Sequence, residues 1–342
     1  MVAPELRDGS ATSDDVLGPI SQVEEPLSAL QARFGDQARA YRQAGRTAGT
    51  RRVYESAFAL FKEWCARHQA SPLPADPRTV AFYLTDAARR YRATTLDLHL
   101  AAIAYAHRVA GLPIPTTHQA VREVRTGVRR THGAPARGKA ALMTEDLRRL
   151  LGLLDEMPVG LRDRALLLLG FAGAFRRSEL VGLDVEDLEF TPRGIRVALR
   201  RSKTDQEAEG RPVGIPYGAS VETCPVRAVE RWLAHVRSVL PGYDRGPLFL
   251  RLDAGGRVRL GRLSDRGVAR VVQRWAERAG LDPSRFAGHS LRAGLATSAA
   301  AGGVSERAIM NQTGHRSLAM VRRYIRDGEL FRDDNAARGA GL

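Results

Sequence analysis

The chain contains few cysteines and few lysines. Cys65 and Cys224 are its only cysteines, which excludes the disulfide framework that stabilises many small secreted proteins. Of its 53 basic residues only three are lysines, namely Lys62, Lys139 and Lys203. Because an arginine guanidinium keeps its proton near neutral pH while a lysine ammonium can release one, these few lysines stand out as proton donors.

Long apolar segments are missing as well. The longest apolar run covers residues 165–175 and is too short to span a bilayer. The N-terminus lacks the basic-then-apolar order of a secretory signal peptide. Together with the scarcity of cysteine, these absences predict a soluble protein of the cytoplasm with no membrane partner.

Positive charge, in contrast, is in excess. The 53 arginine and lysine residues outnumber 38 acidic ones, which gives a net charge of +15 and a pI near 10.8. This balance favours a polyanionic partner, above all nucleic acid, although charge alone also fits an arginine-rich surface without such a partner. The length of 342 residues and the hydrophobic content of 44% predict two domains, or three, with apolar cores.

The first part of the chain reads as an acidic tail followed by a basic helical domain. Residues 1–28 hold six acidic residues and one arginine, which predicts a disordered tail. From residue 29 to 140 the balance reverses, with 19 arginine and lysine residues against seven acidic ones, a net charge of +12. Apolar spacing predicts an all-α domain over 29–132. Its expected helices cover residues 50–68, 78–91, 94–110 and 117–132.

A basic face on such a domain suits binding to the DNA backbone, while a solvated charged surface is the alternative. We predict seven arginines as DNA contacts, six in this domain and one further along the chain. They are Arg51, Arg52, Arg90, Arg92, Arg129, Arg130 and Arg266.

Beyond a glycine- and proline-containing linker at 133–140, the second domain, 141–342, mixes helical and strand patterns. Alternating apolar residues predict strands around 195–199 and 213–215, and a third at 248–250. We expect Thr144 to act as the N-cap of the first helix. Further helices are expected over 163–170, from about Ser178, over 225–239 and over 264–279. The domain is therefore predicted to be α+β, mostly helical with a small antiparallel sheet.

Four residues that can bind or attack a phosphate lie close together in the sequence of this second domain. They are His289, Arg292, His315 and Tyr324. On a helix the first two share a face, because they are three residues apart. Gly314 allows a sharp turn just before the second histidine. Arginines 322, 323 and 326 flank the tyrosine, and nearby cations stabilise a phenolate, which helps a phenol act as a nucleophile.

Cleaving a phosphodiester without a metal requires a nucleophile, a base and an acid for the leaving oxygen. We assign Tyr324 as the nucleophile and His289 as the base that takes its proton. Lys203 is the predicted acid, since an ammonium can donate its proton to a leaving alkoxide and a guanidinium practically cannot.

The same reaction needs cations that neutralise the charge on the pentacoordinate phosphorus. Arg176 and Arg292 are the predicted clamp, and His315 would hydrogen-bond a phosphate oxygen. Glu179, one turn after Arg176, would orient either that arginine or His289.

No metal site is predicted. The sequence shows no dense acidic cluster of the two-metal kind. A zinc site made of His289, His315 and Cys224 is conceivable, but the spacing of these residues matches no usual ligand pattern.

Five motifs of the second domain occur in a recognisable order. They are Phe-Arg-Arg-Ser-Glu-Leu at 175–180, Ser-Lys-Thr-Asp at 202–205, His-Ser-Leu-Arg at 289–292, Gly-His at 314–315, and Tyr324. In order and spacing they resemble the signature motifs of the tyrosine recombinases, the phage integrase family. The resemblance covers about 142 to 335, and the helical first domain is similar to the family's core-binding domain.

Within the family, residues 90–115 and 288–292 are similar to Cre-like recombinases in particular. The chain length and the acidic tail are similar as well. Cre-like enzymes can carry tryptophan at the position of His315, whereas histidine is the commoner choice across the family. Residues 328–337 resemble the family's last helix, which docks into a neighbouring protomer.

The resemblance implies a site-specific recombinase that needs no metal, no ATP and no other cofactor. Tyr324 would cut one strand, forming a 3′-phosphotyrosyl bond and a free 5′-hydroxyl. Four protomers would hold two double-stranded DNA sites with inverted repeats and exchange strands through a Holliday junction. We expect this homotetramer to be associated with the nucleoid.

Two alternatives stay open. A type IB topoisomerase shares this catalytic set but relaxes supercoils as a monomer, and the separate helical domain and the docking helix argue against it. A DNA-binding protein without activity would have a decayed site, whereas the set of predicted catalytic residues is intact.

Overall fold

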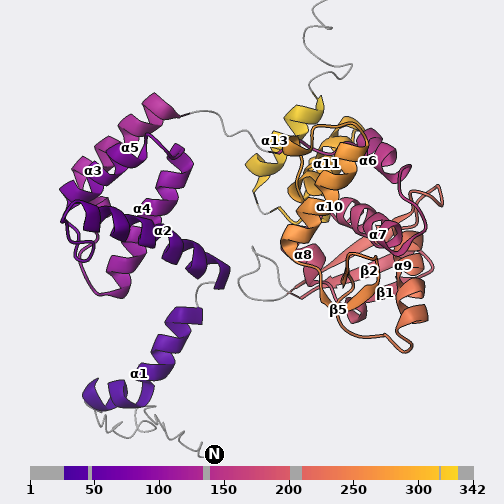
Figure 1. Cartoon of the computed structure of the whole chain (residues 1–342), viewed down its shortest axis with the longest axis horizontal. Helices are drawn as coiled ribbons and strands as arrows, with labels where there is room; N and C mark the ends of the chain where they lie inside the picture. The colour runs from indigo at the N-terminus through magenta and orange to yellow at the C-terminus, as the bar shows by residue number, and fades with distance from the viewer. Residues whose placement is uncertain (1–26, 45–47, 134–138, 201–209, 316, 330–342) are drawn as a thin grey trace, which may run out of the picture. The chain divides into compact units, whose positions relative to one another are not determined.

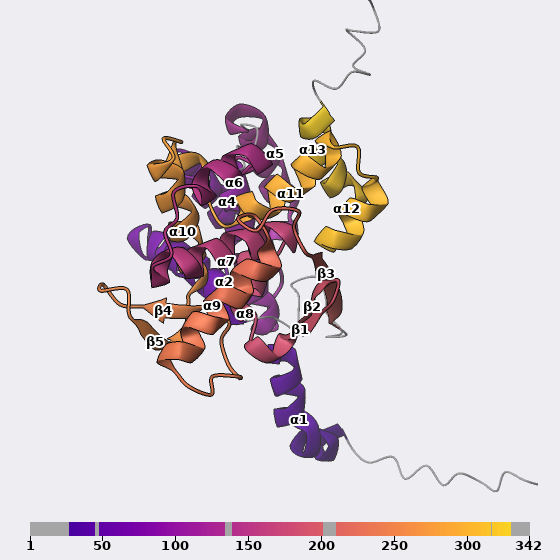
Figure 2. The ribbon, with the colours of Figure 1, turned by 90° about the vertical axis from the view of Figure 1, so that its right-hand side faces the viewer.

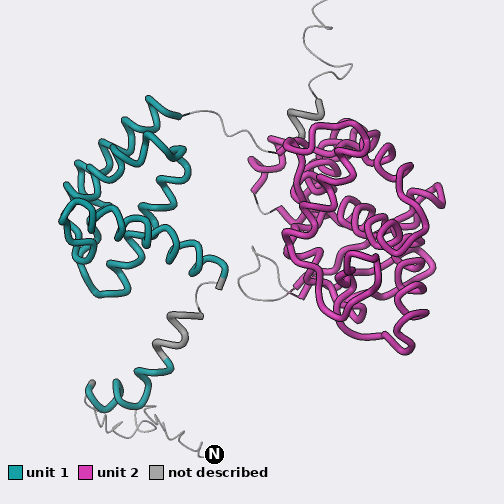
Figure 3. The backbone as a smooth tube through the Cα atoms, in the orientation of Figure 1, with its two compact units in different colours: residues 1–136 teal, residues 137–342 magenta. Residues whose placement is uncertain are grey.

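The computed structural model describes residues 27–44, 48–133, 139–200, 210–315 and 317–329. They belong to two compact units within the ranges 1–136 and 137–342 (Figure 3). None of the helices in these described ranges is long and apolar enough to cross a membrane.

Unit 1 is helical in its described residues (Figure 1). Its elements are α1 (Leu27–Ala44), α2 (Ala48–Arg67), α3 (Pro77–Ala87), α4 (Ala93–Val109), the short 3-10 helix η1 (Pro115–Thr117) and α5 (Gln119–His132). The four predicted helices are confirmed with shifted ends. Helix α1 was not predicted, and it includes the last two residues of the predicted tail, whose residues 1–26 lie outside the described ranges.

Helices α2 to α5 share one core, in which Phe61, Tyr83, Ile103 and Val121 are buried. The aromatic rings of Phe61 and Tyr83 meet edge to face at 5.0 Å between centroids. This packing buries the apolar stripe of each helix and leaves the arginines of α5 on the outside, as the periodicity of the sequence predicts.

Unit 2 combines helices with two small antiparallel sheets (Figures 1 and 2). Its helices are α6 (Thr144–Leu151), α7 (Pro158–Ala172), α8 (Arg177–Gly182), η2 (Val185–Asp187), α9 (Pro225–Val239), α10 (Asp265–Arg278), η3 (Pro283–Arg285), α11 (His289–Ala301), α12 (Glu306–Thr313) and α13 (Leu318–Glu329). Its strands are β1 (Leu188–Thr191), β2 (Gly194–Leu199), β3 (Arg211–Pro216), β4 (Leu250–Leu252) and β5 (Val258–Arg262). The predicted α+β class is confirmed.

Helix α7 forms the centre of unit 2. It is buried on all sides from Arg162 to Gly170 and packs against α9 and α11 (Figure 2). Gly294 lets α11 come very close to the chain, because a Cβ atom at this position would lie 1.9 Å from the carbonyl oxygen of Leu142. This close approach fixes the helix whose first turn carries His289 and Arg292.

One strand was missed, and one strand prediction needs correction. The sheet β1-β2-β3 contains the two alternating segments as β2 and β3, but its first strand, β1, was missed because it is only four residues long. The segment predicted at 248–250 contributes Leu250 to β4, which pairs with β5 in a separate sheet and not with β2 or β3. Which strands pair depends on contacts that are distant in the sequence.

The predicted cap at Thr144 is also wrong. Thr144 is the first residue of α6, and Met143 occupies the N-cap position without a side-chain hydrogen bond. The backbone N–H of Thr144 instead donates to Ser298 Oγ of α11 at 3.2 Å. A tertiary contact therefore replaces the local cap and ties α6 to α11.

Candidate active site

Five of the predicted catalytic residues and Glu179 come from elements that pack together in unit 2. Arg176 is the N-cap residue of α8, and Glu179 lies in the first turn of that helix. His289 and Arg292 share the first turn of α11, which packs against both α12 and α13. His315 follows α12, and Tyr324 lies on α13. Lys203 belongs to residues 201–209, outside the described ranges, and its role stays a prediction.

The predicted nucleophile and base are in contact. Val321 and Tyr324 of α13 pack on a small apolar cluster that contains Ala296 of α11 and Ile309 of α12. This packing places the Tyr324 hydroxyl 3.0 Å from His289 Nε2. The distance is that of a hydrogen bond through which a phenol can pass its proton to an imidazole.

His289 is suited to accept that proton. Its side chain is accessible to solvent, yet the surrounding protein desolvates the ring and lowers its pKa, and the charges of Arg292 and Arg176 lower it further. The imidazole is therefore neutral at pH 7 and has a lone pair for the phenol proton.

One of the three arginines that the sequence places around the phenol is bound to another residue. Arg322, expected to stabilise the phenolate, donates from Nε to Glu306 Oε1 at 3.1 Å. Arg292 of α11 is a further cation near the phenol, because a charge on Tyr324 acts to raise the pKa of this arginine. The tyrosine thus faces a cation of the predicted phosphate clamp.

Arg292 is buried without enough hydrogen-bond partners. It is 1% exposed, and its Nη1 donates to the Ala174 carbonyl at 2.7 Å. Its Nε and Nη2 have no partner within the described part of the chain. Burial, followed by the charge of Arg176, lowers the pKa of Arg292 to about 10. Unsatisfied buried donors cost free energy, and an anion such as a phosphate would satisfy them.

The backbone around Ala174 is strained in a way that serves this arginine. Ala174 has a φ of 48°, a conformation that residues with a side chain adopt rarely. Its carbonyl is the acceptor for Arg292, so the strained turn helps to hold the guanidinium in place.

Glu179 orients Arg176. Its Oε1 accepts from Arg176 Nη1 at 2.5 Å, and its Oε2 accepts from the backbone N–H of the same residue at 2.9 Å. Of the two partners that we predicted for this carboxylate, the structure places it on the arginine and not on His289.

His315 is buried beside the same cations. Its pKa is lowered to about 4, first by burial and then by the charges of Arg292 and Arg176. Its Nδ1 lies 2.8 Å from Thr313 Oγ1. As predicted, the chain turns just before it, since Gly314 has a left-handed φ of 64°.

Sequence reasoning missed Arg211, the first residue of β3. Its Nη1 and Nη2 donate to the carbonyl oxygens of Asn311 and Gln312 at 3.0 and 3.1 Å, at the end of α12. These contacts satisfy orphan carbonyls of the helix and fix the turn that carries His315. Burial lowers the pKa of Arg211, which is a further cation beside the phosphate clamp.

The arginines predicted to contact DNA differ in solvent exposure and in whether they form an ion pair. Arg52, Arg92, Arg130 and Arg266 are exposed, and Arg51 is half-buried on α2. Arg90 pairs with Asp86 at 3.4 Å, and Arg129 pairs with Asp97 at 2.5 Å. Pairing lowers the net positive charge that these last two arginines offer to a phosphate.

Cys224, part of the zinc arrangement considered above, lies elsewhere. It is the N-cap residue of α9, and its Sγ accepts from the Gly218 backbone N–H at 3.2 Å. Across the described residues no group of three or more His, Cys, Asp or Glu side chains is placed to hold a metal ion.

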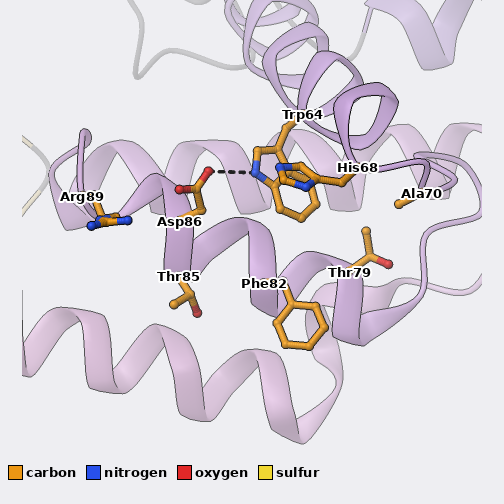
Figure 4. Close-up of a pocket in the computed structure, with 8 residues that line it drawn as sticks. All are labelled: Trp64, His68, Ala70, Thr79, Phe82, Thr85, Asp86 and Arg89. Atoms are coloured by element: carbon orange, nitrogen blue, oxygen red, sulfur yellow. Dashed lines mark hydrogen bonds between the residues drawn. The ribbon is translucent and has the colours of Figure 1, made fainter.

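A pocket of about 540 Å³ lies in unit 1 and contains none of the predicted catalytic residues (Figure 4). Trp64, Ala70 and Phe82 line it together with polar and charged residues, and Phe82 is 66% exposed. The Trp64 indole donates to Asp86 Oδ2 at 2.9 Å. The pocket is thus a surface feature of α2, α3 and the residues that follow each helix.

Comparisons with known proteins agree with the geometry of unit 2. Residues 141–329 match the model of the phage integrase family. The chain is 41% identical over 289 residues to the "Integrase/recombinase xerD homolog" of Selenomonas ruminantium, covering 83% of each chain. It is 32% identical to the "Tyrosine recombinase XerC" of Myxococcus xanthus, over 54% of this chain and 56% of that protein.

Two solved structures have a similar fold. The XerH site-specific recombinase bound to its palindromic difH substrate matches 75% of this chain and 70% of its own, with a TM-score of 0.56 and 19% identity. A lambda integrase dimer bound to a COC′ core site matches 89% of this chain and 98% of its own, with a TM-score of 0.56 and 18% identity. These relatives are of the XerC, XerD and integrase types, and the similarity to Cre-like enzymes stays a prediction. By its match over 141–329 and its similarity to the xerD homolog, the chain belongs to the phage integrase family of tyrosine recombinases.

Proposed function

We propose that this protein is a site-specific recombinase that cuts and rejoins double-stranded DNA through a 3′-phosphotyrosyl intermediate. The observation that carries the proposal is the buried Arg292, whose Nε and Nη2 have no partner among the described residues. Its charge acts on both members of the hydrogen-bonded pair of Tyr324 and His289. A scissile phosphate bound there would satisfy the donors and meet the phenol oxygen.

In the proposed cleavage step the phenol oxygen of Tyr324 forms a bond to phosphorus and the bond to the 5′-oxygen breaks. The phenol proton passes to His289 Nε2. The leaving 5′-oxygen takes a proton from Lys203. Arg176, held by Glu179, and Arg292 neutralise the charge that develops on the phosphate oxygens.

Rejoining is the reverse reaction. The 5′-hydroxyl of another strand attacks the phosphotyrosyl bond, which stores the energy of the original ester. No metal, ATP or other cofactor is required for this exchange.

We further propose that residues 29–132 are the core-binding domain, joined by residues 133–140 to a catalytic domain at 141–342. The net charge of +12 over 29–140 supports contact with the DNA backbone. Four protomers would assemble on two inverted-repeat sites and exchange strands through a Holliday junction. Residues 330–337 of the proposed docking helix lie outside the described ranges.

The test uses a suicide substrate, a duplex from the DNA flanking this protein's own gene with a nick next to the cleavage position. Release of the short fragment traps the covalent adduct, which denaturing electrophoresis separates from free DNA. Tyr324→Phe should abolish the adduct but keep DNA binding, because only the phenol oxygen is lost. Tyr217→Phe, on an exposed tyrosine of unit 2, is the matched control.

An adduct that survives in Tyr324→Phe would rule out this nucleophile, and no adduct in the wild type would favour a DNA-binding protein without activity. Exchange of flanks between two labelled duplexes separates a recombinase from a type IB topoisomerase. The topoisomerase would relax supercoiled plasmid but yield no recombinant product.

A further inference from the structure

Thr313 is a buried polar residue that the proposed reaction does not use. It is the last residue of α12, and no part of it is exposed. Its Oγ1 lies 2.7 Å from the Ile309 carbonyl oxygen and 3.4 Å from that of Met310. A carbonyl oxygen can only accept, so the single hydroxyl proton of Thr313 points to these carbonyls of the helix.

This arrangement determines which nitrogen of His315 carries a proton. Nδ1 lies 2.8 Å from Thr313 Oγ1, whose own proton is already donated. The oxygen can therefore only accept from Nδ1, and Nδ1 must carry a hydrogen. A neutral imidazole has one N–H, so Nε2 of His315 has a lone pair and no hydrogen to donate.

The surroundings keep this ring neutral as long as no anion is bound. The charged and titratable groups found near it in the described ranges come from four parts of unit 2. They are Arg176 before α8, Arg211 on β3, His289 and Arg292 on α11, and Tyr324 on α13. Within the described ranges these arginines outnumber the carboxylate of Glu179, which binds Arg176. A phosphate among them would offset this excess of positive charge.

We propose that Thr313 is a positioning residue that holds His315 as the Nδ1–H tautomer, so that His315 can donate to a phosphate oxygen only after a second proton binds at Nε2. The proton comes from solvent when the phosphate enters the site. The tautomer assignment concerns the free protein, whereas the proton uptake rests on the proposed function. His315 would then act as an imidazolium that stays in place through its bond to Thr313.

The first test reads the tautomer directly in the full chain without DNA. The protein is labelled with ¹⁵N-histidine, and two-bond ¹H–¹⁵N spectra at pH 7 distinguish a protonated from an unprotonated ring nitrogen. His315→Gln assigns the signals. We expect Nδ1–H in the wild type and in Thr313→Ser, and a shift to Nε2–H or to a mixture in Thr313→Val, which keeps the side-chain shape without the hydroxyl.

An Nε2–H tautomer in the wild type, or an unchanged Nδ1–H tautomer in Thr313→Val, would overturn the assignment. Because the spectra are taken without DNA, this result does not depend on whether the protein is a recombinase. Dispersed spectra of the variant also show that it is folded.

The second test is the pH profile of adduct formation on the suicide substrate in a single turnover. Above the pKa that His315 has in the complex, the wild type and Thr313→Ser should lose about tenfold in rate per pH unit, as the imidazolium is lost. Thr313→Val can donate from a neutral Nε2–H, so its rate should change less than about threefold over the same range. Parallel profiles for all three proteins would overturn the proton uptake, even where the tautomer assignment stands.

Discussion

Arg292 of unit 2 and Arg129 of unit 1 carry the same charge in opposite surroundings. Arg292 is 1% exposed, and two of its nitrogens lack a partner among the described residues. The side chain of Arg129 is 54% exposed and pairs with Asp97 at 2.5 Å. Both residues were predicted to contact DNA phosphates, but only the burial of Arg292 lowers the stability of the folded state.

The difference shows what marks a site in an arginine-rich protein. An exposed ion pair contributes roughly 0–1 kcal/mol and is compatible with any surface. A buried cation with unsatisfied donors is destabilising, and such a group persists where binding or chemistry requires it. The surroundings of an arginine, more than the number of arginines, therefore distinguish an arginine of a catalytic site from one that only adds surface charge.

The largest expected effect is that of Arg292→Met. Cleavage should fall by about 10²–10³-fold, as it does when one preorganised donor to a developing charge is removed. The melting temperature should stay equal or rise, because an apolar side chain of similar length replaces an unsatisfied buried cation. Single-turnover adduct formation and calorimetry measure the two quantities.

Arg129→Met is the matched control in unit 1. At saturating DNA it should change cleavage by less than about threefold, since its exposed pair lies outside the proposed catalytic machinery. If Arg292→Met lost stability and the control lost activity instead, the distinction between the two arginines would be wrong.

Much of the site could be predicted because its residues follow local rules. His289 and Arg292 are three residues apart and share the first turn of α11, and Gly314 provides the left-handed turn before His315. Helical periodicity likewise located α2 to α5, although α1 was overlooked.

Other features depend on contacts that no local pattern contains. Arg211 resembles any arginine that follows a polar loop, yet its acceptors lie about one hundred residues further along the chain. Arg322 lies two residues before Tyr324 in the sequence, but its side chain donates a hydrogen bond to Glu306 of α12. Tertiary packing also divides the strands into two sheets. It likewise places Ser298 Oγ where it accepts a hydrogen bond from the first N–H of α6.

Lys203 offers a test of proton donation as opposed to charge neutralisation. Lys203→Ala should cleave normal DNA about 10²-fold more slowly, because the 5′-oxygen leaves unprotonated. A substrate with sulfur at the bridging 5′ position needs no proton on its leaving group, so the variant should cleave it nearly as fast as the wild type does. Arg292→Met should not be rescued, because its role is to neutralise charge.

If sulfur leaves the Lys203→Ala defect unchanged, Lys203 is only another phosphate contact. His315 would then be the next candidate for the acid. The outcome therefore also bears on the proton that we place on that histidine.

The salt dependence of DNA binding compares two arginines of unit 1, Arg130 and Arg129. Binding of Tyr324→Phe to its site should weaken steeply with salt, with about six phosphate contacts and a slope of roughly −0.9 per contact. Arg130→Ala should reduce the slope by about one, because this exposed side chain carries no ion pair in the described ranges. Arg129→Ala should reduce it less, since Asp97 already neutralises that charge. Anisotropy titrations over a series of salt concentrations measure the slopes, and equal losses for both variants would contradict this ranking.

The smallest expected effect concerns Asp97 itself, which joins α4 to α5. It accepts from Arg125 Nε at 2.6 Å and from Arg129 Nη2 at 2.5 Å. Burial acts to raise the pKa of Asp97, but the hydrogen bonds and charges of the two arginines outweigh it and lower the pKa. A folded-state pKa below the unfolded value means that the carboxylate stabilises the fold above the unfolded pKa, about 3.9. That contribution is lost as the pH falls through the folded pKa.

Asp97→Asn should therefore lower the stability of unit 1 by about 1 kcal/mol at pH 7, a value limited by the exposure of both arginines. The difference from the wild type should shrink as the pH is lowered below about 4, since the wild-type residue then becomes neutral as well. Amide hydrogen exchange in α4 and α5 of the full chain measures this locally, with Glu189→Gln at an exposed pair of unit 2 as the control. A deficit that stays constant from pH 7 to pH 3 would mean that Asp97 acts through packing and not through its charge. In that case the ion pair would contribute nothing to stability, and the contrast of Arg129 with Arg292 would lie in burial alone.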